Sequence, residues 1–333
     1  MVTLDDVARL AGVSRTTASR AMNGVATVKP IRAQAVLNAA ETLGFRPNPA
    51  ARSLARGRHD SVALIIPETD IWDIGNSFLS AAMQGVIREV AASEQQLVMV
   101  IRAAGETDEK FLRFLSASHV DGAMVFLEAH TTELPRLLSD AAVPVVYLGR
   151  PLESDDLDVS YVDSDNVGGA RTAAELLVKA GRRRIAVITG SMELGVTQDR
   201  LRGWSECLKA HGIADDLVAH ADFLQGGGAV AMAEILDRDP TVDGVFVMND
   251  LMSAGALATL RSRGRVVPDD LSLVSFDDTV IATAVEPRLT TIAQPFDELG
   301  SLMVRTLRDL ITQPDAGPFR VTLPTKVVLR DSV

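Results

Sequence analysis

The sequence has little of several features that mark whole classes of protein. Its 333 residues include one cysteine, Cys207, so an internal disulfide is impossible, and a buried structural thiol is expected there. Aromatic residues make up 4%, and no apolar run reaches the ~18 residues of a membrane-spanning helix. Residues 1–6 contain neither a basic segment nor a long apolar one. These absences predict a cytoplasmic protein with no membrane partner and argue against export.

The motifs of many nucleotide-binding and hydrolytic enzymes are absent as well. The chain has no G-x-G-x-x-G after a first strand, no G-x-x-x-x-G-K-[ST], no G-x-S-x-G and no His/Cys spacing typical of a metal site. The glycine run at 226–228 is better explained as a turn that opens a helix than as a phosphate-binding loop. We therefore expect no catalytic residues, no cofactor and no bound metal, although a doubly wound enzyme is one alternative.

Positive charge is scarce overall but concentrated at one end. The net charge is −11, yet residues 1–58 hold nine basic residues against three acidic ones, which gives 9 − 3 = +6 and leaves −11 − 6 = −17 for the rest. A basic head on an acidic body is typical of a modular DNA-binding protein, because only the head has to approach phosphates. A solvated basic face is the simpler alternative, and charge by itself does not decide between them.

The basic head has the pattern of short helices. Thr3 is a good N-cap with Asp6 three residues later, and this first helix is expected to end near Gly12. Ser14 caps a second helical stretch at 15–23, and a third runs from Pro30 to Gly44. Helices this short and this close together predict a helix-turn-helix domain. Prolines 47 and 49 then break the pattern, and residues 50–57 are too few to form a stable helix alone.

The rest of the chain alternates apolar strands with amphipathic helices. Strands are predicted at 62–66, 97–101, 122–127, 143–148, 185–189, 245–248 and 271–276. Short apolar runs of this kind favour parallel strands that are buried on both faces. The pattern restarts after the arginines at 182–184, which indicates two doubly wound subdomains. Ligands of such sheets bind beyond the carboxyl ends of the strands, so the crevice between the subdomains is the expected site.

An ordered set of motifs resembles the LacI/GalR family of bacterial transcription regulators over nearly the whole sequence. In the head, the matching segments are residues 2–8, 11–14, 17, 19–20, 23–24, 43–48 and 51–54. In the body, they are residues 120–122, 147–151, 200–204, 249–250, 275–278 and 289–292. One such fragment is weak support, whereas the ordered set is strong.

The resemblance implies a fold. It consists of an N-terminal all-α helix-turn-helix domain at 1–47, a hinge helix and linker at 48–60, and an effector-binding and dimerisation core at 61–333. The α/β core would be periplasmic-binding-protein-like, with two doubly wound parallel-sheet subdomains. The first would span about 61–160 and 293–322, and the second about 161–292 and 323–333. A periplasmic-type sugar receptor shares this core and is therefore the alternative. Such a receptor should carry a signal peptide and no basic head.

The resemblance also identifies candidate DNA-binding residues. Arg15, Thr16 and Arg20 occupy positions that the family uses to read bases, and arginine can donate two parallel bonds to guanine. Leu54 takes the position from which the family inserts a leucine into the minor groove. An ordinary solvated helix face and a helix-packing leucine are the simpler explanations. The full set expected at DNA is Thr3, Ser14, Arg15, Thr16, Thr17, Ser19, Arg20, Asn23, Asn48, Ala51, Arg52 and Leu54.

Three motif-matched side chains are the leading effector contacts. Asp277 would accept hydroxyl bonds, Arg200 offers a planar donor fork, and Asn249 both donates and accepts. Helix capping, loop order or a structural ion pair are the alternatives for these residues. Position along the resemblance adds the wall residues Trp72, Asn76, Phe78, Phe126, Gly149, Phe223 and Gln294. Phe126 and Gly149 stand where some sugar-responsive members have polar side chains, so the identity of the ligand does not transfer.

These observations together predict a sequence-specific transcription regulator, a repressor. Its partners would be a pseudo-palindromic double-stranded operator DNA, a second copy of the chain in a homodimer or higher oligomer, and a small-molecule effector, a sugar or related metabolite. Effector bound between the subdomains would control operator binding allosterically, in either direction. Such a protein would be cytoplasmic and associated with the bacterial nucleoid.

Overall fold

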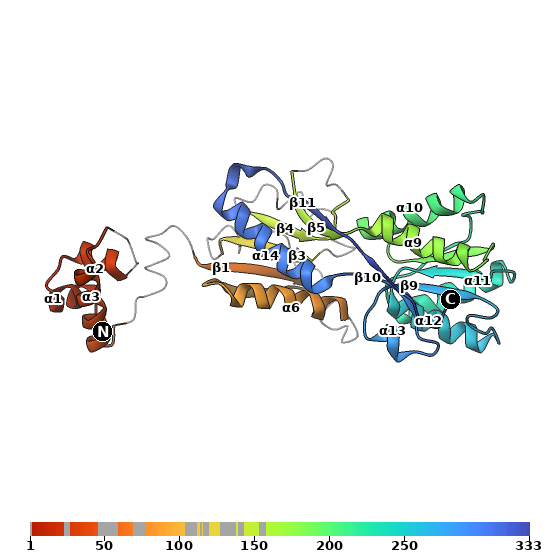
Figure 1. Ribbon diagram of the computed structural model, residues 1–333, viewed down its shortest axis with the longest axis horizontal. Coiled ribbons are helices and arrows are strands. Elements are labelled where there is room, and N and C mark those ends of the chain that lie inside the picture. The colour runs from red at the N-terminus through yellow and green to blue at the C-terminus, as the bar shows by residue number, and fades with distance from the viewer. Residues whose placement is uncertain are drawn as a thin grey trace. The chain divides into compact units, whose positions relative to one another are not determined.

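The computed structural model describes residues 2–22, 27–45, 59–68, 77–103, 112–113, 115, 120–126, 138, 143–152 and 158–333. The chain divides into two compact units, Met1–His59 and Asp60–Val333, and each is described by itself (Figure 1). Within the described ranges, no helix is long and apolar enough to cross a lipid bilayer.

The first unit contains the predicted short helices. They are α1 (Leu4–Leu10), α2 (Arg15–Met22) and α3 (Pro30–Leu43). A capping box begins α1, because Thr3 Oγ1 accepts a bond from the backbone N of Asp6 while the Asp6 side chain accepts one from the backbone N of Thr3. Gly44 ends α3 in the left-handed conformation, at φ 61°. A small apolar core that includes Val7, Ala18 and Val36 holds the helices together.

The second unit contains two sheets, and in the described part of the chain each has six strands. The first sheet has the order β11-β5-β4-β3-β1-β2, and the second has the order β12-β10-β9-β8-β6-β7. The strands of the first sheet are β1 (Ser61–Pro67), β2 (Gln96–Arg102), β3 (Gly122–Phe126), β4 (Val145–Leu148), β5 (Ser160–Ser164) and β11 (Arg320–Leu323). Those of the second sheet are β6 (Ile185–Thr189), β7 (Val218–His220), β8 (Gly244–Val247), β9 (Ser272–Asp277), β10 (Thr290–Ala293) and β12 (Lys326–Val328).

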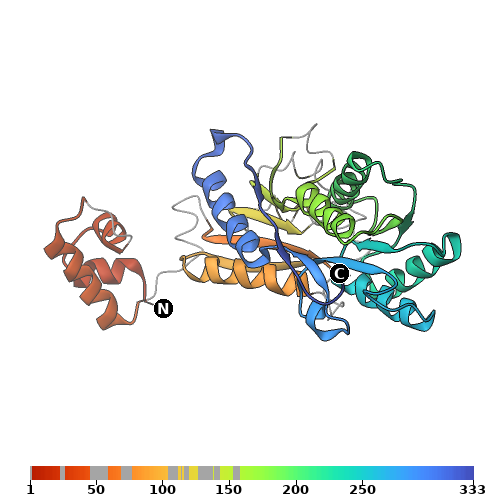
Figure 2. The same cartoon turned by 45° about the vertical axis from the view of Figure 1, so that its right-hand side comes forward.

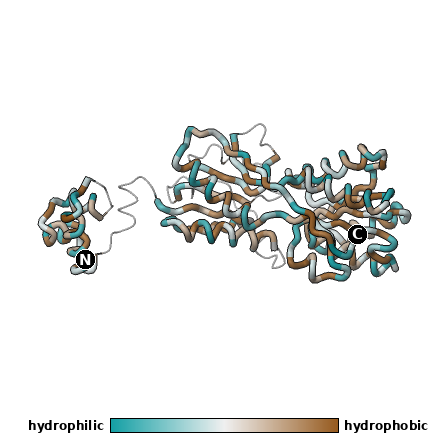
Figure 3. Tube along the Cα trace, in the orientation of Figure 1, coloured by the Kyte–Doolittle hydropathy of each residue, from teal (hydrophilic) through white to brown (hydrophobic). Residues whose placement is uncertain are grey.

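Strand pairing and burial follow the predicted pattern. Every described strand pair is parallel except β10–β12, which is antiparallel. In β1, Val62, Leu64 and Ile66 pack on one face of the sheet, whereas Ala63 and Ile65 belong to the cluster on the other face. Figure 3 shows hydrophobic residues along these strands. The predicted strands are confirmed; β5, β7, β10, β11 and β12 were not predicted as strands.

Helices cover the sheets in pairs. The described helices of this unit are α6 (Ser77–Ala91), α9 (Asn166–Lys179), α10 (Gly195–Ala210), α11 (Gln225–Arg238), α12 (Asp250–Ser262), α13 (Ile281–Ala284) and α14 (Phe296–Thr312), with a 3-10 turn at Pro314–Ala316. The pair α6 and α14 covers one face of the first sheet. The pairs α9/α10 and α11/α12 cover opposite faces of the second sheet (Figure 2). Cys207 on α10 is buried, as predicted.

The chain crosses between the two sheets after β5, after β10 and after β11. We name the part built on the first sheet the first subdomain and the part built on the second sheet the second subdomain. The approximate boundaries expected at 160, 292 and 322 lie close to these crossovers, since β5 ends at Ser164, β10 at Ala293 and β11 at Leu323. The pairing of β5 with β11 keeps residues up to Ser164 in the first sheet.

Candidate functional site

The candidate DNA-contacting surface of the first unit lies on α2. Arg15, Thr16 and Arg20 are exposed on this helix, whereas Ala18 and Ala21 are buried against the other helices. Arg15 lies at the exposed beginning of the helix, which suits it to reach base edges in a major groove, and Arg20 lies in the last turn of the same helix. The structure thus places the three expected base-reading side chains together, on the face of the helix that the protein does not use for packing.

Other predicted DNA contacts in this unit have structural roles as well. Ser14 Oγ accepts a hydrogen bond from Thr17 N at 3.2 Å and lies 2.9 Å from Thr17 Oγ1, so both hydroxyls take part in starting α2. Thr3 caps α1, and Ser19 is partly buried. The expected contacts Asn23, Asn48, Ala51, Arg52 and Leu54 lie outside the described residues.

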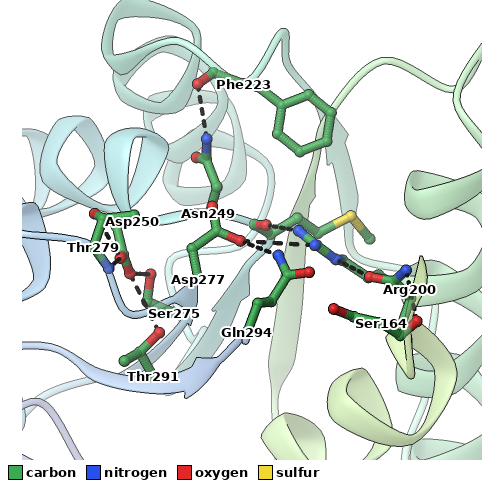
Figure 4. Close-up of polar contacts among 12 residues, drawn as sticks. Ser164, Arg200, Phe223, Asn249, Asp250, Ser275, Asp277, Thr279, Thr291 and Gln294 are labelled. Atoms are coloured by element: carbon green, nitrogen blue, oxygen red, sulfur yellow. Dashed lines mark hydrogen bonds and ion pairs between the residues drawn. The ribbon is translucent and has the colours of Figure 1, made fainter. Parts of the chain in front are cut away.

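The candidate effector site gathers side chains at the carboxyl ends of the strands of the second sheet (Figure 4). Asn249 follows β8, Asp277 ends β9, and Gln294 follows β10. Arg200 reaches the same place from α10, and Phe223 from the loop after β7. Because these strands are parallel neighbours, their carboxyl ends meet at one edge of the sheet. The structure therefore brings the motif-matched residues together, and Phe223 and Gln294 with them.

Arg200 is held rigidly at the centre of this group. Its side chain is 4% exposed, and its guanidinium carbon lies 3.7 Å from the centre of the Phe276 ring. Nε donates to Asn166 Oδ1 at 2.9 Å, Nη1 donates to the carbonyl of Met248, and Nη2 lies 3.7 Å from Asp277 Oδ1. The expected alternative, a structural ion pair, describes part of this arrangement. The rigid guanidinium is also well placed to orient a polar ligand.

Asp277 is the acidic partner of Arg200. Asp277 is 9% exposed, and its Oδ1 accepts a hydrogen bond of 2.6 Å from Gln294 Nε2. Burial raises the pKa of the Asp277 carboxyl to about 7. The positive charge of Arg200 opposes this rise, because it favours the ionised carboxylate. The backbone of Asp277 has φ 109°, in a region that side chains other than glycine seldom adopt. Such backbone strain is found most often at functional sites.

Asn249 has a structural role, the helix capping expected as the alternative to a ligand contact. Its Oδ1 accepts a bond of 2.8 Å from Met252 N and so caps α12, and its Nδ2 donates to the carbonyl of Phe223 at 2.9 Å. The second bond fixes the loop that carries the Phe223 ring. This ring lies against Gly190 at the end of β6, where an added Cβ would come within 2.0 Å of it. Asn249 therefore both orders the site and faces it.

The remaining predicted wall residues differ in their surroundings. Phe126 is 2% exposed, and its ring centre lies 6.1 Å from that of Phe78, which in turn packs at 4.9 Å against Phe296. These rings belong to the core between the first sheet and its helices. Gly149 adopts φ 91°, a conformation that favours glycine. Trp72 and Asn76 lie outside the described residues.

Two groups of polar residues next to the site were not predicted. Asp250, 1% exposed, accepts bonds from Ser275 Oγ at 2.6 Å and from Thr279 N at 2.6 Å, and so fixes the loop after Asp277. Burial raises the pKa of its carboxyl. In the sequence, Asp250 is marked by its place in the motif at 249–250, which does not indicate a role for this residue.

The second group joins the two subdomains. Asp163 on β5 accepts a 2.9 Å bond from Asn166 Nδ2, and Asn166 in turn accepts the Nε bond of Arg200. Arg150, after β4, donates from Nε and Nη2 to the carboxylate of Asp199 on α10, at 3.0 and 3.1 Å. Arg200 lies 34 residues from Asn166, and Asp199 lies 49 residues from Arg150, so the local sequence patterns do not indicate these two contacts.

Comparisons with known proteins agree with the fold and the motifs. Residues 3–48 match the model described as bacterial regulatory proteins, lacI family, and residues 174–333 match a periplasmic binding protein-like domain. The chain is 41% identical to the HTH-type transcriptional regulator CelR of Thermobifida fusca, over 99% of this chain and 98% of that protein.

Solved structures support the same relationship. A complex of the transcriptional regulator CelR with cellobiose matches with a TM-score of 0.79 and 39% identity, over 100% of both chains. The lac repressor dimer bound to operator and the anti-inducer ONPF matches in fold with a TM-score of 0.83, at 24% identity, over 99% of this chain and 98% of that one. With a relative more than 40% identical over nearly the full length of both sequences, this chain belongs to the LacI family of DNA-binding bacterial transcription regulators.

Proposed function

We propose that this regulator is a repressor that binds a pseudo-palindromic operator as a homodimer and responds to a small molecule held between its two subdomains. The observation that carries the proposal is the polar group of Arg200, Asn249, Asp277 and Gln294 at the strand ends of the second sheet, next to the crossovers. The protein acts by binding rather than by catalysis, in the cytoplasm at the nucleoid. The LacI-family match at residues 3–48 favours this function over that of a periplasmic-type receptor.

The proposed effector is a sugar, and cellobiose is the first candidate. The CelR relative at 39% identity was solved as a cellobiose complex, which supports a similar ligand here. Sugars present many hydroxyl groups. The carboxylate of Asp277 accepts hydrogen bonds from such groups, and the guanidinium of Arg200 donates hydrogen bonds to them. The partly buried ring of Phe223 offers an apolar surface for a sugar face. Trp72 and Asn76 complete the proposed wall, whereas the expected wall residues Phe78 and Phe126 pack in the core of the first subdomain.

In the proposed DNA complex, Arg15, Thr16 and Arg20 read bases in each half-site. Thr17 and Ser19 contact phosphates, and Leu54 enters the minor groove between two hinge segments. The remaining proposed contacts are Thr3, Ser14, Asn23, Asn48, Ala51 and Arg52. Each head covers few base pairs, so a symmetric dimer doubles the length of the site.

Exposed apolar side chains on β2 support the dimer. This strand lies at the edge of the first sheet, where Met99 is 46% exposed and Ile101 is 51% exposed. Apolar side chains on an open sheet edge favour association, and a second copy of the chain would cover them. Light scattering at micromolar concentration should therefore give the mass of a dimer or of a larger oligomer.

The test of the whole proposal is an operator-binding titration with and without cellobiose. A labelled duplex enriched by the protein from a random library should bind with an affinity that falls steeply as salt rises. Adding cellobiose should change this affinity about 5- to 150-fold, which corresponds to a coupling of ~1–3 kcal/mol.

Two variants show whether the response to cellobiose depends on the proposed site. Asp277→Ala should remove the response to cellobiose and leave operator affinity without the sugar nearly unchanged. Asp237→Ala removes an exposed carboxylate that pairs with Arg263 on the surface and should behave like the wild type. A wild-type response in Asp277→Ala would contradict the proposed site, and enrichment of no duplex at all would contradict the DNA-binding function.

A further inference from the structure

A buried hydroxyl without a partner lies at the end of β5. Ser164 is 3% exposed, and its Oγ is among the buried side-chain atoms that lack a hydrogen-bond partner in the described part of the chain. Its backbone is fixed on both sides, because Ser164 N donates to Asp163 Oδ1 at 2.8 Å and its carbonyl accepts from Asn166 Nδ2 at 3.1 Å. An unsatisfied buried hydroxyl lowers the stability of the folded protein, so its presence calls for a physical explanation.

The hydroxyl faces the candidate effector site. In Figure 4, Ser164 lies beside Arg200, and its hydroxyl points toward the side of the view on which Gln294 and Asp277 lie. The connection to Arg200 is tight, because Asn166 bonds both to the Ser164 carbonyl and to Arg200 Nε. Ser164 thus belongs to the same group of side chains, but it comes from the first subdomain, whereas Arg200 and Asp277 come from the second.

Buried hydroxyls on the opposite side of the site are paired. Ser275, fully buried on β9, donates to Asp250 at 2.6 Å and lies 2.8 Å from the hydroxyl of Ser253. On that side of the site the fold supplies partners for buried hydroxyls, whereas Ser164 Oγ, like Thr197 Oγ1 on α10, has no partner in the described part of the chain. Ser164 and Ser275 are both buried serines at or near the carboxyl end of a parallel strand.

We propose that Ser164 is a further effector contact, which hydrogen-bonds a hydroxyl group of the bound sugar from the first subdomain. This inference rests on the proposed function and adds to it a specific residue. A serine hydroxyl both donates and accepts, so it suits the uncharged hydroxyl of a sugar. The ligand then touches Arg200 and Asp277 on one side and Ser164 on the other, and it stabilises the arrangement in which both subdomains reach it.

The first arm of the test needs no ligand. Ser164→Ala removes a hydroxyl that has no partner, so the melting temperature of the sugar-free full-length protein should stay the same or rise. Ser275→Ala is the matched control; it removes two hydrogen bonds and should lower the melting temperature by about 3 to 8 °C. If Ser164→Ala lowers the melting temperature as much as Ser275→Ala, the hydroxyl has a structural partner and the proposal is overturned.

The second arm measures cellobiose binding by calorimetry. Ser164→Ala should weaken binding about 3- to 10-fold, the range for loss of one hydrogen bond between uncharged groups. Unchanged cellobiose affinity in Ser164→Ala would overturn the contact even if the wild-type protein binds the sugar well. If the wild type binds operator DNA but neither cellobiose nor a panel of other uncharged sugars, the proposed effector class is wrong. The melting arm then still decides whether Ser164 has a structural partner.

Discussion

The buried carboxyl of Asp277 gives the second subdomain a pH dependence that one substitution removes. Burial raises the pKa of this carboxyl in the folded protein to about 7, although the nearby Arg200 opposes the rise. In the unfolded chain, the pKa returns to the ordinary value of 3.8. At pH values between 3.8 and about 7, the Asp277 carboxyl is protonated in the folded state and ionised in the unfolded state. The carboxyl therefore favours folding most at low pH.

The size of the effect follows from the two pKa values. Since the unfolded state binds fewer protons between about pH 4 and 7, the free energy of unfolding falls through this range as pH rises, and it levels off above. Each pH unit in the range corresponds to about 1.4 kcal/mol for one group. From pH 5 to 7, the wild type should thus lose about 2 to 3 kcal/mol relative to Asp277→Asn, whose amide does not titrate. Burial also raises the pKa of Asp163, to about 6, but that residue is present in both proteins.

Urea unfolding at pH 5, 6, 7 and 8 measures this difference. The fluorescence of Trp204, which is fully buried in the core of the second subdomain, reports on the relevant part of the molecule. Asp237→Asn, at an exposed position on α11, is the control and should keep the pH profile of the wild type. Parallel profiles for the wild type and Asp277→Asn would refute the assignment of a raised pKa to this carboxyl.

Three further substitutions test the head, the hinge and the packing of the second subdomain. Arg20→Ala should relax base preference at one position and weaken operator binding by ~1–3 kcal/mol, and a selection from randomised duplexes that returns the wild-type preference would contradict this role. Leu54→Ala should weaken operator binding by a few kcal/mol and spare random DNA; equal losses in titrations of both duplexes would rule out insertion into the minor groove. Gly203→Ala places a Cβ 2.1 Å from the carbonyl of Val167, so α9 and α10 have to separate, at a cost of about 1–3 kcal/mol in urea unfolding. An unchanged midpoint would mean that the helices have room to spare.

Strongly periodic segments of the fold were predictable from sequence, and weakly periodic ones were not. The strands at β3 and β6 are buried along their whole length, and their uninterrupted apolar runs identify them. By contrast, β5 contains the buried polar residues Ser160 and Asp163, which accept bonds from Phe319 N and Arg150 N, and it pairs with β11. A strand whose polar side chains are satisfied by distant segments has no local pattern to reveal it.

The candidate site was predictable to the extent that its residues lie in motifs. The structure brings Asn249 and Asp277 together at one edge of the second sheet, since parallel strands end together, and Arg200 reaches the same place from α10. Asn166 was missed because its role comes from contacts with Asp163 and with Arg200, 34 residues further along the chain. A short polar side chain after a strand is most often a turn or a helix cap, and only the packed structure distinguishes this case.

The position of the site links ligand binding to the arrangement of the subdomains. Asp163 and Asn166 flank the crossover after β5, and Asn166 accepts a bond from Arg200. Gln294 lies at the crossover after β10 and donates to Asp277. A ligand that engages Arg200 or Asp277 therefore acts on side chains already bonded to residues at two crossovers, where small backbone rotations move one subdomain against the other. Any ligand that prefers one arrangement shifts the equilibrium toward it, and by reciprocity a DNA duplex that prefers the same arrangement must raise the affinity for that ligand by the same factor.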